Sequence, residues 1–291
     1  QPAYVFSPAE VWDGLRTDDE KWLSNGLIRD WASWQKENGQ AFQQLKKVLE
    51  VLSPSPEELL TPGELTRVSL DDVRDIPTVR MPYQQDVPVI YASSGMRRIM
   101  ALAYFLVWAW QEHRQAAKLL QQPEAHQVIF LIDEVESHLH PSWQRKIVPA
   151  LLNLMDSLAQ EAETQLITAT HSPLIMASVE PWFDHQQDAW FDLDICQDKE
   201  NQVPKVKLTR REFIRRGDAS RWLTSEAFDL SSARSEEAEQ TLNDASEALK
   251  REDLSKNEAL ELDKRLREVL GDTDPFWMRW RFVAEQKGWL E

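Results

Sequence analysis

Apolar side chains recur every three or four positions over the first 52 residues, which predicts amphipathic helices in this part of the chain. The pattern ends at residues 53–56, where two prolines interrupt it, and residues 61–63 predict a turn. Short alternating stretches then predict strands, at residues 65–70, 78–81 and 87–90.

The middle of the chain alternates between predicted helices and strands. A long helix is predicted from Ser94 to about residue 120, before a break at residues 121–123. Residues 128–132 are apolar without interruption, which predicts a strand buried on both faces. The next predicted elements are a helix at 141–160, a strand at 166–170 and a short helix at 173–179. This order predicts an α/β fold in which the two strands pair in parallel.

The last hundred residues combine a predicted hairpin with helices. Strands at residues 190–195 and 205–208 flank a polar turn at residues 198–201. The pattern is helical and strongly charged over residues 231–270, and an aromatic segment follows at residues 276–282. We expect that segment to be a helix face packed on the body of the protein, with an anchor for a partner as the alternative.

The composition is that of a soluble globular protein, with 42% hydrophobic and 28% charged residues in 291. No apolar run reaches the roughly 18 residues of a membrane span, so we expect no membrane segment. A single cysteine, Cys196, excludes an internal disulfide and fits a cytoplasmic protein. The first residues, Gln1-Pro2-Ala3, form neither a signal peptide nor a start methionine, so we expect a processed or truncated chain.

The net charge of −16 means that the average surface repels nucleic acid. A nucleic-acid partner therefore needs a local basic patch, and the sequence offers one cluster of arginines. Its members are Arg210, Arg211, Arg215, Arg216 and Arg221. Internal salt bridges or an acidic partner are the alternatives for these side chains.

The pair Asp133-Glu134, which directly follows the apolar strand, is the first candidate site. In open α/β sheets, ligands bind at the carboxyl ends of the strands, where this pair is expected to lie. Asp133 would hold Mg²⁺, usually through water, as a hard oxygen ligand, and Glu134 would position and polarise an attacking water. Two solvated acids at a strand end are the alternative.

Ser93-Ser94-Gly95, at the start of the long predicted helix, is the second candidate site. Backbone amides at a helix N-terminus attract anions, and glycine lets a phosphate approach the backbone closely. The sequence therefore predicts a phosphate contact, with a plain serine N-cap as the alternative. Arg97 or Arg98 would add positive charge or bind a partner chain.

His171 ends the next predicted strand and is the third candidate, 38 residues after Asp133 (171 − 133). That distance is enough for one crossover helix and a return to the neighbouring parallel strand, so we expect both residues at one edge of the sheet. His138 and His140 lie between them in a predicted turn. Structural hydrogen bonds are a simpler interpretation of these two histidines than a pair of metal ligands.

These motifs, in this order, resemble the second half of an ABC-type ATPase head of the RecF/SMC/OLD-like group, and in particular the bacterial AAA_21-type ATPases. The resemblance runs from about residue 87 to about residue 240. It implies an α/β fold of the RecF/SMC-like P-loop NTPase type, with residues 63–230 as its C-terminal lobe. Residues 1–62 would be a helical insertion or subdomain, and residues 231–291 a charged helical extension.

The resemblance also implies a role for each motif. Ser94 and Gly95 stand at the signature positions that contact the γ-phosphate held by the opposite subunit, with Ser93 beside them. Residues 137–141 stand at the D-loop, which crosses the dimer interface in the family. The Asp-Glu pair matches the Mg²⁺-binding and catalytic carboxylates, and His171 matches the histidine that senses the γ-phosphate. ATP and Mg²⁺ are thus the implied cofactors, and a homodimer or higher homo-oligomer the implied assembly.

The sequence contains no Gly-x-x-x-x-Gly-Lys-[Ser/Thr] loop, which ABC heads need to hold the phosphates. The order of the motifs places this Walker A loop upstream of residue 1, so we expect the chain to be the C-terminal part of a longer ATPase; a degenerate lobe without the loop is the alternative. Many AAA_21-type ATPases act in antiphage defence, including the Septu-type ATPase that works with an HNH nuclease. The resemblance therefore implies a nuclease or another effector protein as partner.

Two other functions stay open: a non-catalytic nucleotide-sensing scaffold, and an OLD-like nuclease or DNA-repair ATPase. The nuclease hypothesis rests on Asp192-Leu193-Asp194, which is similar to the Asp-x-Asp of a Toprim site. No matching glutamate-bearing strand precedes it, so an edge strand with outward acids is the simpler interpretation.

Overall fold

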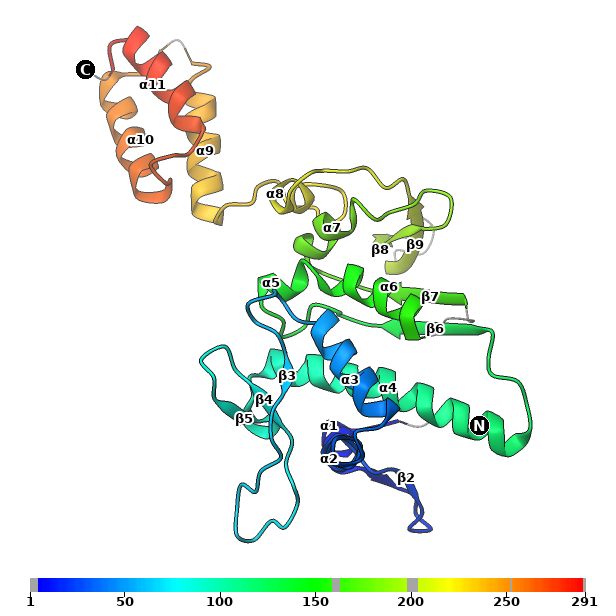
Figure 1. Ribbon diagram of the computed structural model, residues 1–291. Helices are drawn as coiled ribbons and strands as arrows, with labels where there is room; N and C mark the ends of the chain where they lie inside the picture. Colours follow the sequence, from blue (N-terminus) through cyan, green and yellow to red (C-terminus); the bar gives the residue numbers. More distant parts are fainter. Residues whose placement is uncertain (1–4, 159–162, 198–203, 252, 290–291) are drawn as a thin grey trace. The chain divides into compact units, whose positions relative to one another are not determined.

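The computed structural model describes residues 5–158, 163–197, 204–251 and 253–289 (Figure 1). The chain forms two compact units, Gln1–Ala219 and Ser220–Glu291. The division into three parts at residues 62 and 230 stays a prediction.

The N-terminal part contains helices and one small hairpin. Its elements are α1 (Pro8–Asp13), β1 (Leu15–Arg16), β2 (Trp22–Ser24), α2 (Leu27–Glu37) and α3 (Gln40–Val51). The helical prediction is wrong at Trp22, which lies in β2. Gly14 and Gly26 flank the hairpin with positive φ values of 101° and 84°, and a Cβ on Gly26 would collide with the amide nitrogen of Gly14. Such an approach of two backbones requires glycine, and helical spacing alone does not reveal it.

A small antiparallel sheet follows, with the strand order β3 (Thr61–Pro62), β4 (Thr78–Arg80), β5 (Asp86–Pro88). The prediction of a strand at residues 65–70 is wrong, because only an isolated bridge between Thr66 and Ile76 forms there. After β5 a 3-10 turn, Val89–Tyr91, replaces the end of the predicted strand and leads into the long helix.

The long helix α4 (Ser94–Leu120) begins and ends where the sequence predicts. The elements after it are β6 (Gln127–Ile132), α5 (Pro141–Gln144), α6 (Ile147–Leu158), β7 (Glu163–Thr168) and α7 (Pro173–Val179). The helix predicted over residues 141–160 is thus two helices. The strands β6 and β7 pair in parallel, as predicted, with Leu131 opposite Ile167.

One hydrophobic core joins the N-terminal helices to this α/β part. Trp31 of α2, Leu49 of α3, Tyr104 of α4 and Leu151 of α6 are all buried in it. Figure 1 shows α3 beside α4, in agreement with their packing in this core.

The β6–β7 sheet packs on this core with one face only. Phe130 and Leu166 lie against the core, whereas Ile129, Leu131 and Ile167 on the other face are 64%, 77% and 46% exposed. The prediction that residues 128–132 are buried on both faces is therefore wrong for this structure. The second apolar face of the sheet has no cover among the described residues.

Asp30 on α2 brings a carboxylate into the core, where it is only 7% exposed. Its Oδ2 accepts a hydrogen bond from the hydroxyl of Tyr104 at 2.8 Å, and its Oδ1 accepts one from Asn25 Nδ2 at 2.8 Å. Burial raises the pKa of Asp30, although both hydrogen bonds oppose the shift. Burial, followed by the charge of Asp30, also raises the pKa of Tyr104 and that of Glu112.

The strands β8 (Trp190–Gln197) and β9 (Pro204–Arg211) form the predicted antiparallel hairpin. The predicted turn at residues 198–201 lies outside the described residues. Leu193 and Leu208 are opposite each other and are 69% and 62% exposed. Side chains alternate between the faces of a strand, so one face of this ribbon is apolar and open while the other is charged. The short helix α8 (Ala219–Leu223) follows.

The second unit contains the helices α9 (Glu236–Ala248), α10 (Lys256–Val269) and α11 (Phe276–Gln286). Trp277 and Trp280 of α11 are buried in a core with residues of α9 and α10, and Trp280 Nε1 donates to Asp263 Oδ1 at 2.9 Å. We expected the aromatic segment to pack on the body of the protein, but these two tryptophans complete the core of their own unit. Across the described part of the chain, no helix combines the length and the apolar character that crossing a bilayer requires.

Candidate functional site

Asp133 and Glu134 follow β6 directly, and both residues are exposed. Glu134 has a φ of 46°, a left-handed conformation that is uncommon outside glycine, so the chain turns sharply at this point. One carboxylate oxygen of Glu134, Oε2, accepts a hydrogen bond from Ser137 Oγ at 2.8 Å. The loop therefore restrains the Glu134 side chain, while the Asp133 carboxylate stays at the solvent-facing end of the strand.

The two serines at the start of α4 have different positions. Ser93 is the N-cap, and its hydroxyl accepts a hydrogen bond from the amide of Met96 at 3.3 Å. Ser94 is the first helical residue and is exposed. The plain-cap interpretation thus applies to Ser93, and the Ser94 hydroxyl is left at the helix N-terminus, where a phosphate contact stays a prediction.

Gly95 is buried because the loop that follows β6 packs on it. A Cβ on Gly95 would lie 2.7 Å from the carbonyl oxygen of His138, so this approach excludes any larger residue. His138 itself has a φ of 60°. The first turn of α4 is therefore in direct contact with the loop that carries Asp133 and Glu134.

Arg98, one turn further along α4, contacts the same loop. Its Nη2 donates to the carbonyl oxygen of Glu134 at 2.7 Å and to that of Asp133 at 3.4 Å. Arg97 instead places its guanidinium 5.0 Å from the ring centroid of Trp12. Both arginines contact their own chain, which the sequence did not predict.

His171 follows β7 and lies at the same sheet edge, because Ile132 and Thr168 are paired at the ends of the two parallel strands. A glutamate that the sequence analysis left without a role connects the two loops. Glu136 accepts hydrogen bonds from Thr170 Oγ1 at 2.8 Å and from the amide of His171 at 2.5 Å. The only sequence signal for Glu136 was a second acid two positions after Glu134.

A second connection lies next to this one. Ser172 Oγ donates to Gln144 Oε1 at 2.7 Å, and Gln144 Nε2 donates to the carbonyl oxygen of Leu139 at 3.0 Å. Ser172 Oγ also caps α7 by accepting from the amide of Ile175 at 3.4 Å. The loops after β6 and β7 and the end of α5 are thus held in one hydrogen-bonded arrangement.

Of the two histidines between the motifs, His140 has a structural side-chain contact. His140 is the N-cap of α5, and its Nδ1 lies 2.9 Å from Ser142 Oγ. Among the described residues, no group of three or more His, Cys, Asp or Glu is arranged to hold a metal ion. Asp133 offers one carboxylate at a strand end, and its role in holding Mg²⁺ stays a prediction.

The Asp-x-Asp sequence in β8 does not form an acidic metal site. Asp192 has a side chain only 15% exposed and is ion-paired with Arg211 at 3.0 Å. Asp194 Oδ1 accepts a hydrogen bond from the amide of Ile195 at 2.7 Å. The salt-bridge interpretation of the arginine cluster therefore holds for Arg211.

A family model described as "AAA domain, putative AbiEii toxin, Type IV TA system", AAA_21, matches residues 2–177. The match covers more than half of the chain and includes all three candidate motifs.

Two curated relatives are similar to parts of the chain. The retron Vc95 probable ATPase of Vibrio cholerae serotype O1 biovar El Tor is 42% identical over 60 residues, which are 21% of this chain and 10% of the relative. The retron Ec83 probable ATPase of Escherichia coli is 25% identical over 162 residues, which are 55% of this chain and 26% of the relative. The chain thus matches only a small part of each relative's length.

Solved structures of SMC proteins align loosely with the chain. One, from a study of ATP-driven dimerization and DNA-stimulated activation of SMC ATPases, aligns with a TM-score of 0.36 at 14% identity over 62% of this chain and 89% of its own. The SMC head domain from Thermotoga maritima aligns with a TM-score of 0.31 at 13% identity over 62% of this chain and 51% of its own.

Proposed function

The chain belongs to the AAA_21 family, and on that premise we propose that it forms part of an ABC-type ATPase head that binds and hydrolyses ATP. The fold is α/β, of the P-loop NTPase type that the family implies. The observation that carries the proposal is the junction at the ends of β6 and β7. There the loop with Asp133 and Glu134 is hydrogen-bonded to the segment with His171, and the first turn of α4 packs on it.

The two acids at the end of β6 have different proposed roles. Asp133 offers exposed carboxylate oxygens, the hard ligands that Mg²⁺ requires, and the bound ion would offset negative charge on the phosphates. Glu134 is restrained by Ser137 through one oxygen, and its proposed role is to orient the attacking water. His171 is proposed to contact the γ-phosphate from the neighbouring strand end.

The start of α4 is proposed to bind a nucleotide held by a second copy of the chain. Its first amides and the Ser94 hydroxyl together suit an anion, and Ser94 is exposed because Ser93 serves as the cap. ATP would then join the heads as a homodimer or higher homo-oligomer, and hydrolysis would open them.

The proposed purpose of this cycle is to regulate a partner effector, a nuclease or another protein, in bacterial antiphage defence. Two things support this proposal: the names of the two relatives, both of which are retron ATPases, and the resemblance of the sequence motifs to AAA_21-type ATPases, many of which act in such defence. A cytoplasmic location belongs to the same proposal.

The test is steady-state ATP hydrolysis by the complete protein, combined with light scattering of its assembly state with and without ATP. We expect Mg²⁺-dependent hydrolysis and a larger assembly when ATP is bound. ATP binding without turnover would favour a nucleotide-sensing scaffold instead. Metal-dependent nicking of DNA by this polypeptide alone would favour an OLD-like nuclease.

A further inference from the structure

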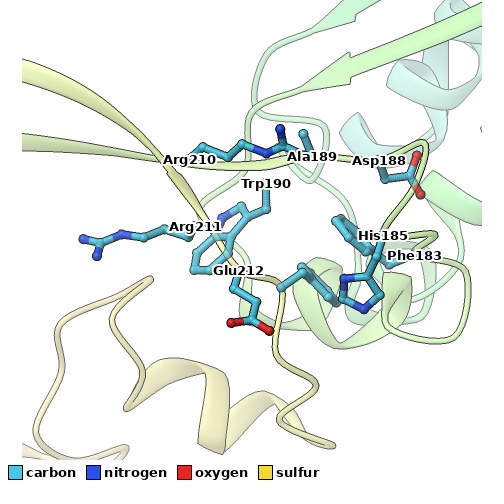
Figure 2. A pocket seen from close by; sticks show the side chains of 9 residues that line it. Phe183, His185, Asp188, Ala189, Trp190, Arg210, Arg211 and Glu212 are labelled. Atoms are coloured by element: carbon cyan, nitrogen blue, oxygen red, sulfur yellow. The ribbon is translucent and has the colours of Figure 1, made fainter.

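A pocket of about 340 Å³ lies at the base of the β8–β9 hairpin, and Figure 2 shows the side chains that line it. Its wall is aromatic. The rings of Phe183 and Phe213 are stacked, with centroids 4.0 Å apart and planes at 7°. His185 meets Phe183 edge-on at 5.3 Å, and Trp190 meets Phe213 edge-on at 6.3 Å. The stacked faces of Phe183 and Phe213 contact each other and Phe213 is buried, so the ring most open to a flat ligand is that of His185, which is exposed.

The segment that borders this pocket, β9 and the five residues after it, is basic, although the chain as a whole is acidic. Residues 204–216 contain six lysines and arginines and one glutamate, in a chain of net charge −16. Arg211 is ion-paired with Asp192, whereas Arg210 has no ion pair with a described residue. Figure 2 shows the guanidinium of Arg210 beside Ala189 at the pocket and that of Arg211 extending away from it. A local positive charge of this kind attracts an anionic ligand.

We propose that this pocket binds single-stranded nucleic acid: one base enters it and stacks on the aromatic wall, while Arg210 contacts the adjoining phosphate. Stacking on aromatic side chains next to a basic groove is how proteins hold single strands with little sequence preference. The inference goes beyond the proposed ATPase, because none of the lining residues belongs to the loops after β6 and β7.

Two carboxylates line the pocket, and they make a neutral base a better occupant than an anion. Asp188 and Glu212 both line it, and their negative charge disfavours a free phosphate or an acidic peptide. The amino groups of cytosine, adenine or guanine instead donate hydrogen bonds to carboxylates. Asp188 Oδ2 already accepts a bond from the amide of Asp184 at 2.8 Å, so we assign the contact with the base edge to Glu212.

Arg210 also has an aromatic neighbour on the open face of the hairpin. Phe191 lies directly opposite Arg210 across the two strands, and Phe191 is 49% exposed. Residues opposite each other in an antiparallel pair share one face of the sheet. A second base therefore has an aromatic ring next to the same guanidinium.

The test is fluorescence anisotropy with labelled strands of about 20 nucleotides, longer than the roughly 4–16 nucleotides that one single-strand-binding module covers. Single-stranded DNA, single-stranded RNA and the matching duplex are compared, with AMP as a competitor. ATP and Mg²⁺ are left out, so failure of the ATPase proposal does not affect the result. We expect the single strands to bind at low salt about tenfold more tightly than the duplex, because a base of the duplex must first be unpaired and unstacked before it can enter the pocket.

Three substitutions locate the site. We expect Arg210→Glu to weaken single-strand binding at least about tenfold. The slope of the logarithm of the binding constant against the logarithm of the salt concentration should fall in magnitude by about one, the value for one lost phosphate contact. His185→Ala should weaken it about fivefold or more through lost stacking. Arg67→Glu makes the same charge change at an exposed arginine outside the basic segment and should leave binding unchanged.

Several results would overturn the proposal. They are no binding by the unaltered chain at low salt, equal affinity for duplex and single strand, or equal affinity of the Arg210→Glu and Arg67→Glu variants. Strong competition by AMP would instead identify a site for a free nucleotide. Circular dichroism checks that each variant is folded, and Arg210→Gln replaces Arg210→Glu if the latter does not fold.

Discussion

Arg98 Nη2 donates a hydrogen bond of 2.7 Å to the main-chain carbonyl oxygen of Glu134, across 36 positions of the sequence. Glu134 has a left-handed φ of 46°, a conformation that a residue other than glycine keeps only where its surroundings stabilise it. One turn earlier on the same helix, Gly95 packs on the carbonyl oxygen of His138, whose φ is 60°. The start of α4 thus supports both left-handed positions of the loop that carries the proposed catalytic acid.

We expect Arg98→Ala to lower ATP turnover at least about tenfold with little change in the KM for ATP, because small displacements of a reacting group are costly. Arg98→Lys should recover part of the turnover, since a lysine keeps a donor at this position. Arg97→Ala is the matched control and should leave kcat nearly unchanged. A folded Arg98→Ala protein with normal kcat would show that Glu134 needs no support from α4.

Glu134→Gln in the complete protein should abolish turnover while preserving ATP binding. The amide keeps the size of the side chain but orients and polarises water poorly, and losing such a group typically costs about 10²–10⁴ in rate. Turnover and equilibrium ATP binding are measured on the same preparation, with Glu64→Gln, an exposed acid elsewhere, as the control. Near-normal turnover would remove Glu134 from the mechanism.

Asp133→Ala should have a different effect from Glu134→Gln, because it removes the proposed oxygen ligand of Mg²⁺ and not the group that orients water. We expect weaker nucleotide binding when Mg²⁺ is present and little change when it is absent. Titration of a fluorescent ATP analogue with and without Mg²⁺ separates the two cases. Unchanged Mg²⁺-dependent affinity together with continued hydrolysis would show that the role of Asp133 was assigned wrongly.

Ser94→Arg should spare ATP binding to the isolated head but block ATP-driven dimerisation and hydrolysis, because its bulk falls where the opposing phosphate would dock. Ser93→Ala is an instructive control, since Ser93 is the cap. Loss of a serine cap costs about 0.5–2 kcal/mol of stability, so this variant should melt at a lower temperature yet still dimerise. Full activity of Ser94→Arg would contradict the proposed signature.

Complementation extends the Ser94 prediction. A mixed dimer of Ser94→Arg with a partner inactivated in its phosphate-binding loop should recover one composite site, formed by the intact loop of the first chain and the intact Ser94 of the second. The two inactive proteins are mixed and ATP turnover is measured. Demonstrated mixed dimers without recovery would argue against a site shared between subunits, unless both sites must act together.

Asp30→Asn should make the stability of the protein less dependent on pH. Because burial raises the pKa of Asp30 in the folded state, the folded state binds this proton more tightly than the unfolded state. The contribution of Asp30 to stability is then most favourable at low pH and is lost as the pH rises through its folded pKa. The free energy of unfolding is measured in urea at pH 4 and pH 7. Relative to the unaltered protein, the variant should be more stable at pH 7 than at pH 4. An equal difference in the free energy of unfolding at both pH values would contradict the expected shift.

Much of the local structure could be predicted from the sequence. The helix α4 has an apolar period and a serine cap, and the β8–β9 hairpin has two short strand patterns around a polar turn. The predictions failed where a distant contact overrides the local pattern. Trp22 has helical spacing but lies in a strand, because the backbones at Gly14 and Gly26 approach each other closely.

By itself the sequence determined the order and spacing of the motifs, and hence that Asp133, Glu134 and His171 follow two neighbouring parallel strands. The sequence could predict this because two consecutive apolar strands pair in parallel when the segment between them is long enough for a crossover helix.

The tertiary structure decided the connections between the motifs: which serine caps α4, that Arg98 holds the backbone of Glu134, and that Glu136 binds the segment before His171. It also decided which face of the β6–β7 sheet is covered and which rings form the pocket beside Arg210. The spacing of apolar residues shows only which side chains of a helix or strand lie on the same face. Contacts across 35 or 36 positions depend on how whole elements pack, which no local pattern records.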